Sequence, residues 1–315
     1  MNPEYVQWLR REKPDLVVLG SDATGVGRWS ALAARACGIP TLVCQEGCRH
    51  LYELDRAPLK IRVKRFLTQI AYRMVNPIGV LAEEFMTADF AAVWGEHNRR
   101  MLRRKTGVYV VGSPETSLVR KKLRPAGASP RILFLDTPFS SVSKGTFDVS
   151  SINRLRFEMF GVLGKENVEI WYKPHPFTLP EEREPMRRAL EARAGARFIE
   201  TGDPMELYKD CDACMTFPST CVLTSLAYGI PLFHLELPIA GWGKMLWNPV
   251  ERFDAGVAIH RPGDLAAAVG RLRDSVWLAE YSEKSRRAAL DVAGPLDGKA
   301  PERFAECVSQ ILNYS

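Results

Sequence analysis

The sequence predicts an α/β protein with two domains, each built around a parallel sheet. Short apolar runs rich in β-branched residues alternate with segments of helical periodicity along the whole chain, which is the pattern of βαβ units. A length of 315 residues suits about two domains of roughly 150 residues each. Hydrophobic residues make up 46% of the chain and charged residues 25%, a globular composition that excludes a disordered or fibrous protein.

The first domain is expected to span residues 1–114. A buried strand at 16–19 begins it, and the helix that follows ends at Gly38 and Pro40. A basic amphipathic segment separates the second and third strands. The predicted elements are strands at 16–19, 41–44, 91–94 and 109–111, and helical segments at 29–37, 59–74 and 96–105.

A linker is expected at residues 115–130, which are polar, basic and interrupted by proline and glycine. The alternation then restarts and defines a second domain, 131–315. Apolar residues recur at helical spacing from Phe304 to Leu312, so the chain is expected to end in an amphipathic helix. The strands predicted for this domain lie at 131–135, 168–172, 197–199, 213–216 and 231–235.

No apolar run reaches the ~18 residues of a membrane-spanning helix. The N-terminus lacks an apolar signal core, so we expect an unprocessed cytoplasmic protein. The seven cysteines are scattered, and Cys211 and Cys214 form a lone C-x-x-C without further zinc ligands at a suitable spacing. We interpret the cysteines as small buried thiols in a reducing compartment, and we expect neither a metal nor a cofactor.

The net charge of +6 is unevenly distributed, with basic clusters at 60–65, 99–105 and 120–124. No aromatic-interleaved recognition motif accompanies these clusters, so nucleic acid is not expected as a partner. An anionic membrane surface and a phosphate-bearing substrate are the remaining candidate partners. Solvated helix faces without any partner are the alternative.

The strongest local signal for chemistry is Lys173-Pro-His175-Pro176, directly after an apolar strand. The two prolines fix the backbone and hold His175 in one direction. A histidine held beside a lysine can donate to a phosphate or hydrogen-bond a base or a sugar. The alternative is a structural turn whose histidine caps backbone carbonyls, but the position at the carboxyl end of a strand favours a binding role.

Hydroxyl side chains follow two other predicted strands of the second domain. Ser219 and Thr220 come after a proline turn and open a helix whose N–H groups suit a phosphate. An ordinary helix N-cap is the alternative for them. Thr137 and Ser140 lie in the loop after the first strand of the domain, where a composition suited to phosphate contacts is also common in plain loops.

The first domain offers two candidate general bases, Glu46 and His50, just past the strand at 41–44. A carboxylate or an imidazole can deprotonate a hydroxyl, and a polar loop around a glycine turn is the alternative. The loop at 20–27 matches neither the Walker pattern nor G-x-G-x-x-G, so a dinucleotide site is not supported. The other histidines have no convergent partners in the sequence and are expected to pack or to lie at the surface: His97, His234 and His260.

Several short motifs follow one another in a set order along nearly the whole chain: Lys13–Gly20, Gly38–Gly47, Ala88–Glu96, Val110–Pro114, Lys173–Pro176, Pro218–Thr220 and Asp297–Arg303. Their order and spacing resemble the GT-B glycosyltransferases of bacterial surface-polysaccharide assembly. This resemblance implies two Rossmann-like domains that face a cleft. It also implies that the N-terminal domain is shortened, because Leu16 to Leu19 would be a mid-sheet strand in those families.

Within that superfamily, a His-Pro motif followed by Ser-Thr is similar to the bacterial sialyltransferases and some capsule enzymes. Transferases for 3-deoxy-octulosonate and for CDP-glycerol are further comparisons. Carried over, the resemblance implies that His175 contacts the CMP moiety and that Ser219 and Thr220 contact the donor phosphate. It makes Glu46 or His50 the general base from the opposing domain.

One position departs from the pattern of these families. Many GT-B enzymes, and the related UDP-N-acetylglucosamine 2-epimerases, carry an acidic residue five positions after the serine that aligns with Ser219, where it holds the donor ribose. That position is Thr224 in this chain. The departure disfavours a UDP-sugar and favours another nucleotide.

The sequence thus predicts a metal-independent glycosyltransferase that moves a sugar from a nucleotide-activated donor, a CMP-sugar by preference. The acceptor is expected to be a glycan or a lipid-linked molecule in surface polysaccharide synthesis. The basic clusters are expected to hold the protein as a peripheral membrane protein on the inner face. Two alternatives are a nucleotide-sugar isomerase similar to UDP-N-acetylglucosamine 2-epimerase, and a non-catalytic binding subunit of a polysaccharide assembly complex.

Overall fold

The computed structural model describes the residues 3–22, 25–46, 87–102, 107–116, 128–139, 148–239 and 248–314. They form two compact units. Unit 1 holds the described residues up to 116 together with 290–314, and unit 2 holds those from 128 to 289. Both units contain a parallel sheet with helices, so the predicted α/β class is confirmed. Outside the described residues lie His50, Ser140 and most of the three basic clusters.

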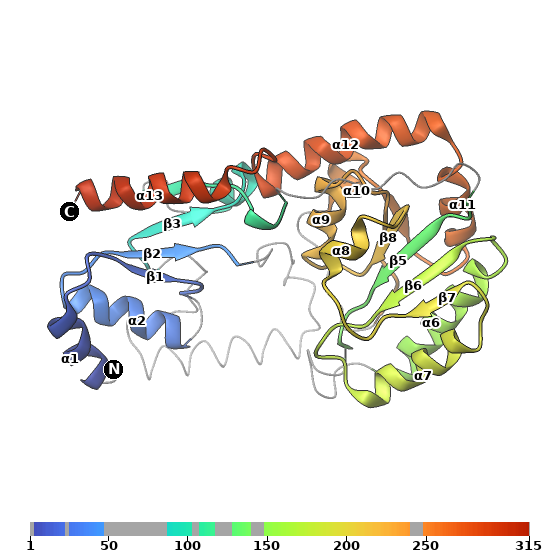
Figure 1. Ribbon diagram of the computed structural model, residues 1–315, viewed down its shortest axis with the longest axis horizontal. Helices are drawn as coiled ribbons and strands as arrows, with labels where there is room; N and C mark the ends of the chain where they lie inside the picture. The colour runs from blue at the N-terminus through green and yellow to red at the C-terminus, as the bar shows by residue number, and fades with distance from the viewer. Residues whose placement is uncertain are drawn as a thin grey trace. The chain divides into compact units, whose positions relative to one another are not determined.

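Unit 1 contains a four-stranded parallel sheet in the order β1-β2-β3-β4 (Figure 1). These strands are short and apolar because helices cover a parallel sheet on both faces. Helices α1 and α2 join β1 in an apolar cluster around Leu9, Ala33 and Ala34. The elements up to β4 are α1 (Pro3–Glu12), β1 (Val17–Leu19), α2 (Gly25–Ala36), β2 (Thr41–Cys44), β3 (Phe90–Val93), α4 (Glu96–Met101) and β4 (Val108–Val110).

The last helix, α13 (Ala300–Tyr314), packs on the sheet of unit 1 (Figure 1). Its buried Cys307 and Ile311 belong to one apolar cluster with Leu42, Ala92 and Val111. The structure therefore differs from the predicted domain boundary: the second domain was expected to run over 131–315, but residues 290–314 belong to unit 1. The physical reason is that the apolar face of α13 covers one face of the first sheet.

Unit 2 contains a six-stranded parallel sheet in the order β10-β9-β8-β5-β6-β7. All five strands predicted for this region are present. A sixth strand, β10, was not predicted. The strands are β5 (Arg131–Leu135), β6 (Glu169–Lys173), β7 (Ala196–Phe198), β8 (Ala213–Thr216), β9 (Leu232–Leu235) and β10 (Val257–Ile259).

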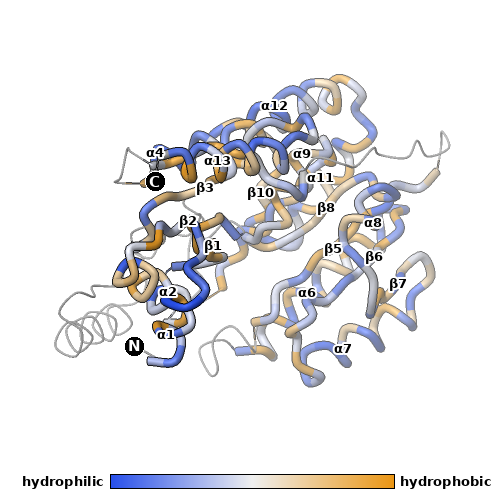
Figure 2. Tube along the Cα trace, turned by 60° about the vertical axis from the view of Figure 1, so that its left-hand side comes forward, coloured by the Kyte–Doolittle hydropathy of each residue, from blue (hydrophilic) through white to orange (hydrophobic). Residues whose placement is uncertain are grey.

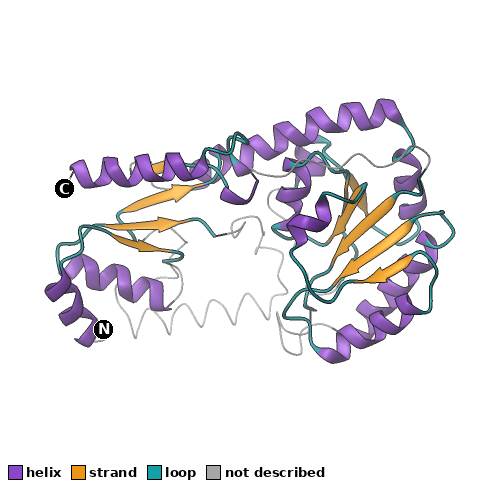
Figure 3. Cartoon of the chain, in the orientation of Figure 1, coloured by secondary structure: helices purple, strands orange, loops and turns teal. Residues whose placement is uncertain are grey.

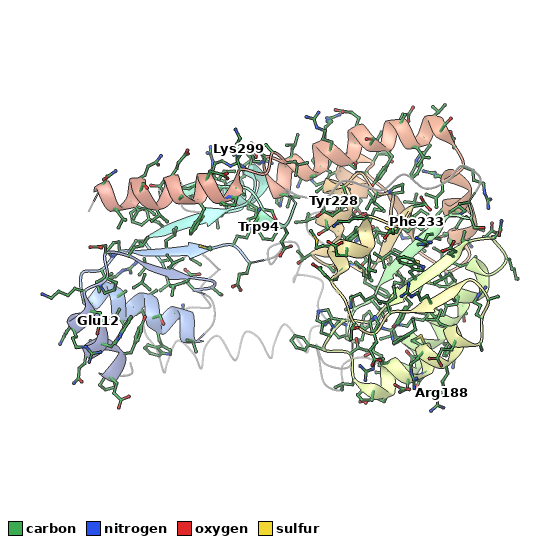
Figure 4. All side chains as sticks on the ribbon, viewed as in Figure 1. Glu12, Trp94, Arg188, Tyr228, Phe233 and Lys299 are labelled. Atoms are coloured by element: carbon green, nitrogen blue, oxygen red, sulfur yellow. The ribbon has the colours of Figure 1, made fainter. Side chains whose placement is uncertain are left out.

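Helices lie on both faces of this second sheet (Figure 3). The helices are α6 (Val149–Leu163), α7 (Pro180–Glu191), α8 (Pro204–Tyr208), α9 (Cys221–Ala227), α10 (Pro249–Phe253), α11 (Asp264–Arg271) and α12 (Ser275–Ala293). On one face α6, α7 and α11 bury Ile132, Phe134 and Phe233, and Figure 4 labels Phe233 in this core. On the other face, Leu133 and Leu135 pack beside α8 and α9.

The long helices α12 and α13 alternate between hydrophilic and hydrophobic residues along their length (Figure 2), as expected for helices with one apolar face. Over the described parts of the chain, no helix is long and apolar enough to cross a membrane. Cys211, Cys214 and Cys307 are buried thiols that form no disulfide, as predicted, whereas Cys37, Cys44 and Cys221 are only partly buried.

Candidate functional site

The carboxyl edge of the unit 2 sheet has a switch point between β5 and β8. The chain runs from β5 to β6 and β7 on one side, whereas β8, β9 and β10 lie on the other. In open α/β sheets, the loops at such a point diverge and leave a crevice where ligands bind. Leu135 of β5 pairs with Lys173 of β6 and with Thr216 of β8. The three loops that follow these strands therefore begin side by side.

A buried ion cluster holds the loop after β5. The fully buried guanidinium of Arg156 pairs with Asp136 at 2.7 Å and with Glu182 at 2.6 Å. The same group donates a hydrogen bond to the carbonyl oxygen of Thr137 at 3.2 Å, and the Tyr172 hydroxyl donates to Asp136. Burial raises the pKa of Asp136, while Arg156 and Tyr172 act in the opposite direction. This network fixes Thr137 at the edge of the sheet.

The loop after β6 presents Lys173 and His175. Lys173 is buried at the end of the strand, and burial lowers the pKa of its ammonium group while Asp203 opposes that shift. His175 is exposed, and its Nδ1 accepts a hydrogen bond from the backbone N–H of Phe177 at 3.1 Å. Partial burial lowers the pKa of His175, so the ring is neutral at pH 7. Because Nδ1 accepts, the proton sits on Nε2, which is the donor that the ring offers to a ligand.

The loop after β8 carries Ser219 and Thr220. Ser219 Oγ accepts a hydrogen bond from the backbone N–H of Cys221 at 3.2 Å, so Ser219 caps α9 as an ordinary N-terminal serine does. Its Oγ also lies 3.3 Å from Oγ1 of Thr216. Thr220 makes no side-chain capping bond to α9. Thr216 donates its hydroxyl hydrogen to the carbonyl oxygen of Phe217 at 3.0 Å, so Ser219 is the donor in the contact with Thr216. A ligand oxygen would have to replace Thr216 as the acceptor of that hydrogen.

The predicted donor-binding residues that the structure describes all lie at this carboxyl edge: Thr137, Lys173, His175, Pro176, Ser219 and Thr220. The pair Asp210 and Asp212, which has Asp-x-Asp spacing, precedes β8 and so lies at the opposite edge. Asp212 accepts the backbone N–H of Arg131 there, at 2.8 Å.

The candidate base Glu46 lies at the carboxyl edge of the unit 1 sheet, just past β2. Its carboxylate rests against Gly20, since a Cβ placed on Gly20 would be 2.2 Å from Glu46 Oε1. The neighbouring Gln45 accepts the backbone N–H of Trp94 at 2.8 Å, which ties this loop to the end of β3. The side chain of Glu46 is therefore placed where β1 and β2 end.

A polar cluster at the ends of β9 and β10 is absent from the sequence predictions. Nδ1 of His234 lies 3.0 Å from Oε1 of Glu236, and Nδ2 of Asn248 donates to the same oxygen at 2.6 Å. Nδ1 of His260 lies 3.8 Å from the other oxygen of Glu236. These histidines were expected to pack or to lie at the surface without convergent partners. His234 is buried and His260 is exposed, but both converge on Glu236. The one available signal is the i, i+2 spacing of His234 and Glu236, which puts both on one face of a strand.

No protein-family model and no curated protein matches the chain. Solved structures match it over nearly its whole length. The glycosyltransferase SnogD from Streptomyces nogalater is 19% identical with a TM-score of 0.57, over 96% of this chain and 75% of that chain. The fold is GT-B.

Two further matches have the same fold. The co-structure of S. aureus MnaA with UDP is 18% identical with a TM-score of 0.59, over 98% of this chain and 78% of that one. The Methanocaldococcus jannaschii UDP-GlcNAc 2-epimerase, in complex with UDP-GlcNAc and UDP, is 16% identical with a TM-score of 0.58, over 99% and 79%. Glycosyltransferases and UDP-GlcNAc 2-epimerases are therefore both similar to this chain in fold.

Proposed function

We propose that the protein is a glycosyltransferase that moves a sugar from a nucleotide-activated donor to a glycan or lipid-linked acceptor in surface polysaccharide synthesis. The observation that carries the proposal is that Thr137, Lys173, His175 and Ser219 lie on three loops that begin side by side at the switch point of unit 2. Ammonium, imidazole and hydroxyl groups all donate to phosphate oxygens. A solved structure of the same fold contains a nucleotide sugar, UDP-GlcNAc.

The proposed chemistry assigns a role to each group. The bond between the anomeric carbon and the phosphate oxygen breaks, and negative charge develops on the departing nucleotide. Lys173 and His175 stabilise that charge through hydrogen bonds. The acceptor oxygen bonds to the anomeric carbon, and its proton passes to a base, for which Glu46 and His50 are the candidates. No metal is assigned to these steps.

The choice of nucleotide rests on separate grounds. The His175-Pro176 and Ser219-Thr220 motifs and the departure at Thr224 support a CMP-sugar. The solved structures with UDP and UDP-GlcNAc make a uridine nucleotide the competing donor. Binding of the nucleotides themselves decides between them, as described in the Discussion.

A nucleotide-sugar isomerase is the second candidate, favoured by the match to the M. jannaschii 2-epimerase. The test is incubation of UDP-GlcNAc, and separately of CMP-sialic acid, with the protein in the absence of any acceptor, followed by NMR. A new isomer of the intact nucleotide sugar supports the isomerase and contradicts the transferase. Transfer that requires an added acceptor supports the transferase, and binding without turnover in either assay supports a binding subunit.

Substitution of Gly20 tests the role of Glu46. A methyl group on Gly20 displaces the carboxylate of Glu46, so Gly20→Ala is expected to lower turnover about 100-fold. The fold tolerates the change, because the displaced atoms are the end of a flexible side chain. The matched control is Gly25→Ala, where nothing lies within 4 Å of the new Cβ and turnover is expected to be unchanged. Equal turnover in the two variants would exclude Glu46 as the base.

Binding to membranes tests the role of the basic clusters at 60–65, 99–105 and 120–124. We expect the protein to sediment with liposomes that contain anionic lipid at low salt and to be released as salt rises, because salt screens the attraction. Liposomes of neutral lipid are the control and should bind none. Sedimentation that is insensitive to salt, or absent with anionic lipid, would contradict a peripheral location.

A further inference from the structure

The polar cluster around Glu236 belongs to the same edge of the unit 2 sheet as the proposed phosphate contacts. His234 in β9 pairs with Thr216 in β8, and Glu236 follows β9 directly. The loop with Ser219 leaves the neighbouring strand β8 at that same edge. Strand β9 is three strand spacings from β6, about 14 Å at about 4.8 Å for each spacing. The cluster thus lies across the edge from Lys173.

The carboxylate of Glu236 is held from the inside of the protein. Its Oε1 lies 3.0 Å from Nδ1 of His234 and accepts Nδ2 of Asn248 at 2.6 Å. Both partners are buried, with 0% and 2% of their surface exposed. Burial by itself would raise the pKa of Glu236, but the hydrogen bonds from His234 and Asn248 hold the pKa below its ordinary value. The group is therefore an ionised carboxylate with a fixed orientation.

His234 orients Glu236 from the buried side of the strand. A carboxylate only accepts hydrogen bonds, so Nδ1 of His234 carries a proton and donates it to Glu236. The ring itself is fully buried. His234 is therefore held in place by the protein interior and fixes the direction of the carboxylate.

One oxygen of Glu236 is available to a ligand. For Oε2, the described residues provide no hydrogen bond, and Nδ1 of the exposed His260 lies 3.8 Å away, which is too long for one. The side chain keeps 19% of its surface exposed. A fixed anion repels phosphate and attracts neutral hydroxyl donors, and two neighbouring hydroxyls can share one carboxylate. This chemistry matches a vicinal diol on a sugar ring.

We propose that Glu236 binds a pair of vicinal hydroxyl groups of the donor, on the nucleotide ribose or on the transferred sugar, while His234 and Asn248 orient its carboxylate. The proposal rests on the proposed function, because it places the donor's phosphates over β6 and a hydroxyl-bearing ring over β9. It assigns Glu236 as a residue that selects hydroxylated ligands and His234 as a positioning residue.

The test is isothermal titration of the full chain with UDP, CMP, 2′-deoxy-UDP, 2′-deoxy-CMP and UDP-GlcNAc, for the natural sequence and for Glu236→Gln. The glutamine side chain has nearly the same shape as glutamate, but it replaces one accepting carboxylate oxygen with an NH₂ group that donates. If ribose is the source of the diol, the natural protein prefers the ribonucleotide about tenfold over its deoxy form, and Glu236→Gln loses that preference. If the transferred sugar is the source, the deoxy form binds equally, and Glu236→Gln loses instead the tenfold advantage of UDP-GlcNAc over UDP.

Two controls separate the possible failures. Glu200→Gln removes an exposed carboxylate that follows β7 and should leave every affinity unchanged. Glu236→Asp keeps the charge but withdraws it by one methylene, and it should show part of the loss if Glu236→Gln does not fold. Unchanged affinities in a folded Glu236→Gln variant would overturn this proposal alone. Failure of the natural protein to bind any of the five ligands would overturn the proposed function together with it.

Discussion

Replacing Arg156 with leucine is expected to destabilise unit 2 by about 3–5 kcal/mol, because it leaves two buried acids without their cation. Arg156 is fully buried and contacts both Asp136 and Glu182. Urea unfolding measures the loss. The control is Arg187→Leu on α7, whose ion pair with Glu184 lies at the solvent-screened surface, so the urea midpoint is expected to shift little.

The pH dependence of that loss identifies its cause. Burial raises the pKa of Asp136 already in the natural protein, and removing Arg156 takes away the cation that opposes this rise. A carboxyl group whose pKa is higher in the folded than in the unfolded chain destabilises the fold once the pH exceeds its pKa in the unfolded chain. At lower pH the group is protonated, and the destabilisation is smaller. The difference in the free energy of unfolding between Arg156→Leu and the natural protein should therefore be smaller at pH 4.5 than at pH 8. An equal difference at the two pH values would indicate that the variant is destabilised by lost packing and not by unpaired charge.

Replacing His175 with alanine is expected to lower kcat/KM for sugar transfer about 100-fold to 1,000-fold, the cost of one lost donor to a developing anion. The melting temperature should change little, because the ring is exposed. Lys173→Met keeps the length of the buried side chain and removes its charge, so it should give a loss of similar size. Steady-state kinetics with the preferred donor measure both.

The control for these variants is Leu179→Ala, an exposed side chain a few residues beyond the same loop, with 37% of its surface accessible. It should leave kcat/KM unchanged. If His175→Ala matches this control in activity, the Lys-Pro-His-Pro segment is a structural turn and the assignment of the donor site to this loop is wrong.

Local patterns were sufficient to predict the strands, because buried parallel strands such as 131–135 are short apolar runs with clear ends. The residues at the carboxyl ends of those strands, His175 among them, could be found for the same reason. The strand at 257–259 was missed, since its only large apolar residues are Val257 and Ile259 and the run is shorter than that of 131–135. The docking of α13 on unit 1 depends on contacts between residues far apart in the sequence, and its amphipathic pattern does not say which sheet it covers.

The electrostatic parts of the site could not be predicted for a related reason. Arg156 lies on an amphipathic helix, where a charged residue is normally exposed, and only the fold brings Asp136 and Glu182 to it. Glu236 has His234 two residues away, but Asn248 comes from the next helix start. Such partners are set by tertiary packing and leave no periodic signal.

A thermal-shift series with CMP, CDP, UDP, GDP and ADP shows whether the carboxyl edge of the unit 2 sheet binds a nucleotide. A ligand at about 100 times its Kd adds about 2.7 kcal/mol of stability, or several degrees in Tm. We expect selective stabilisation by a cytidine or a uridine nucleotide, and the base that stabilises identifies the donor. No shift with any of the five nucleotides would mean that this edge is not a nucleotide site.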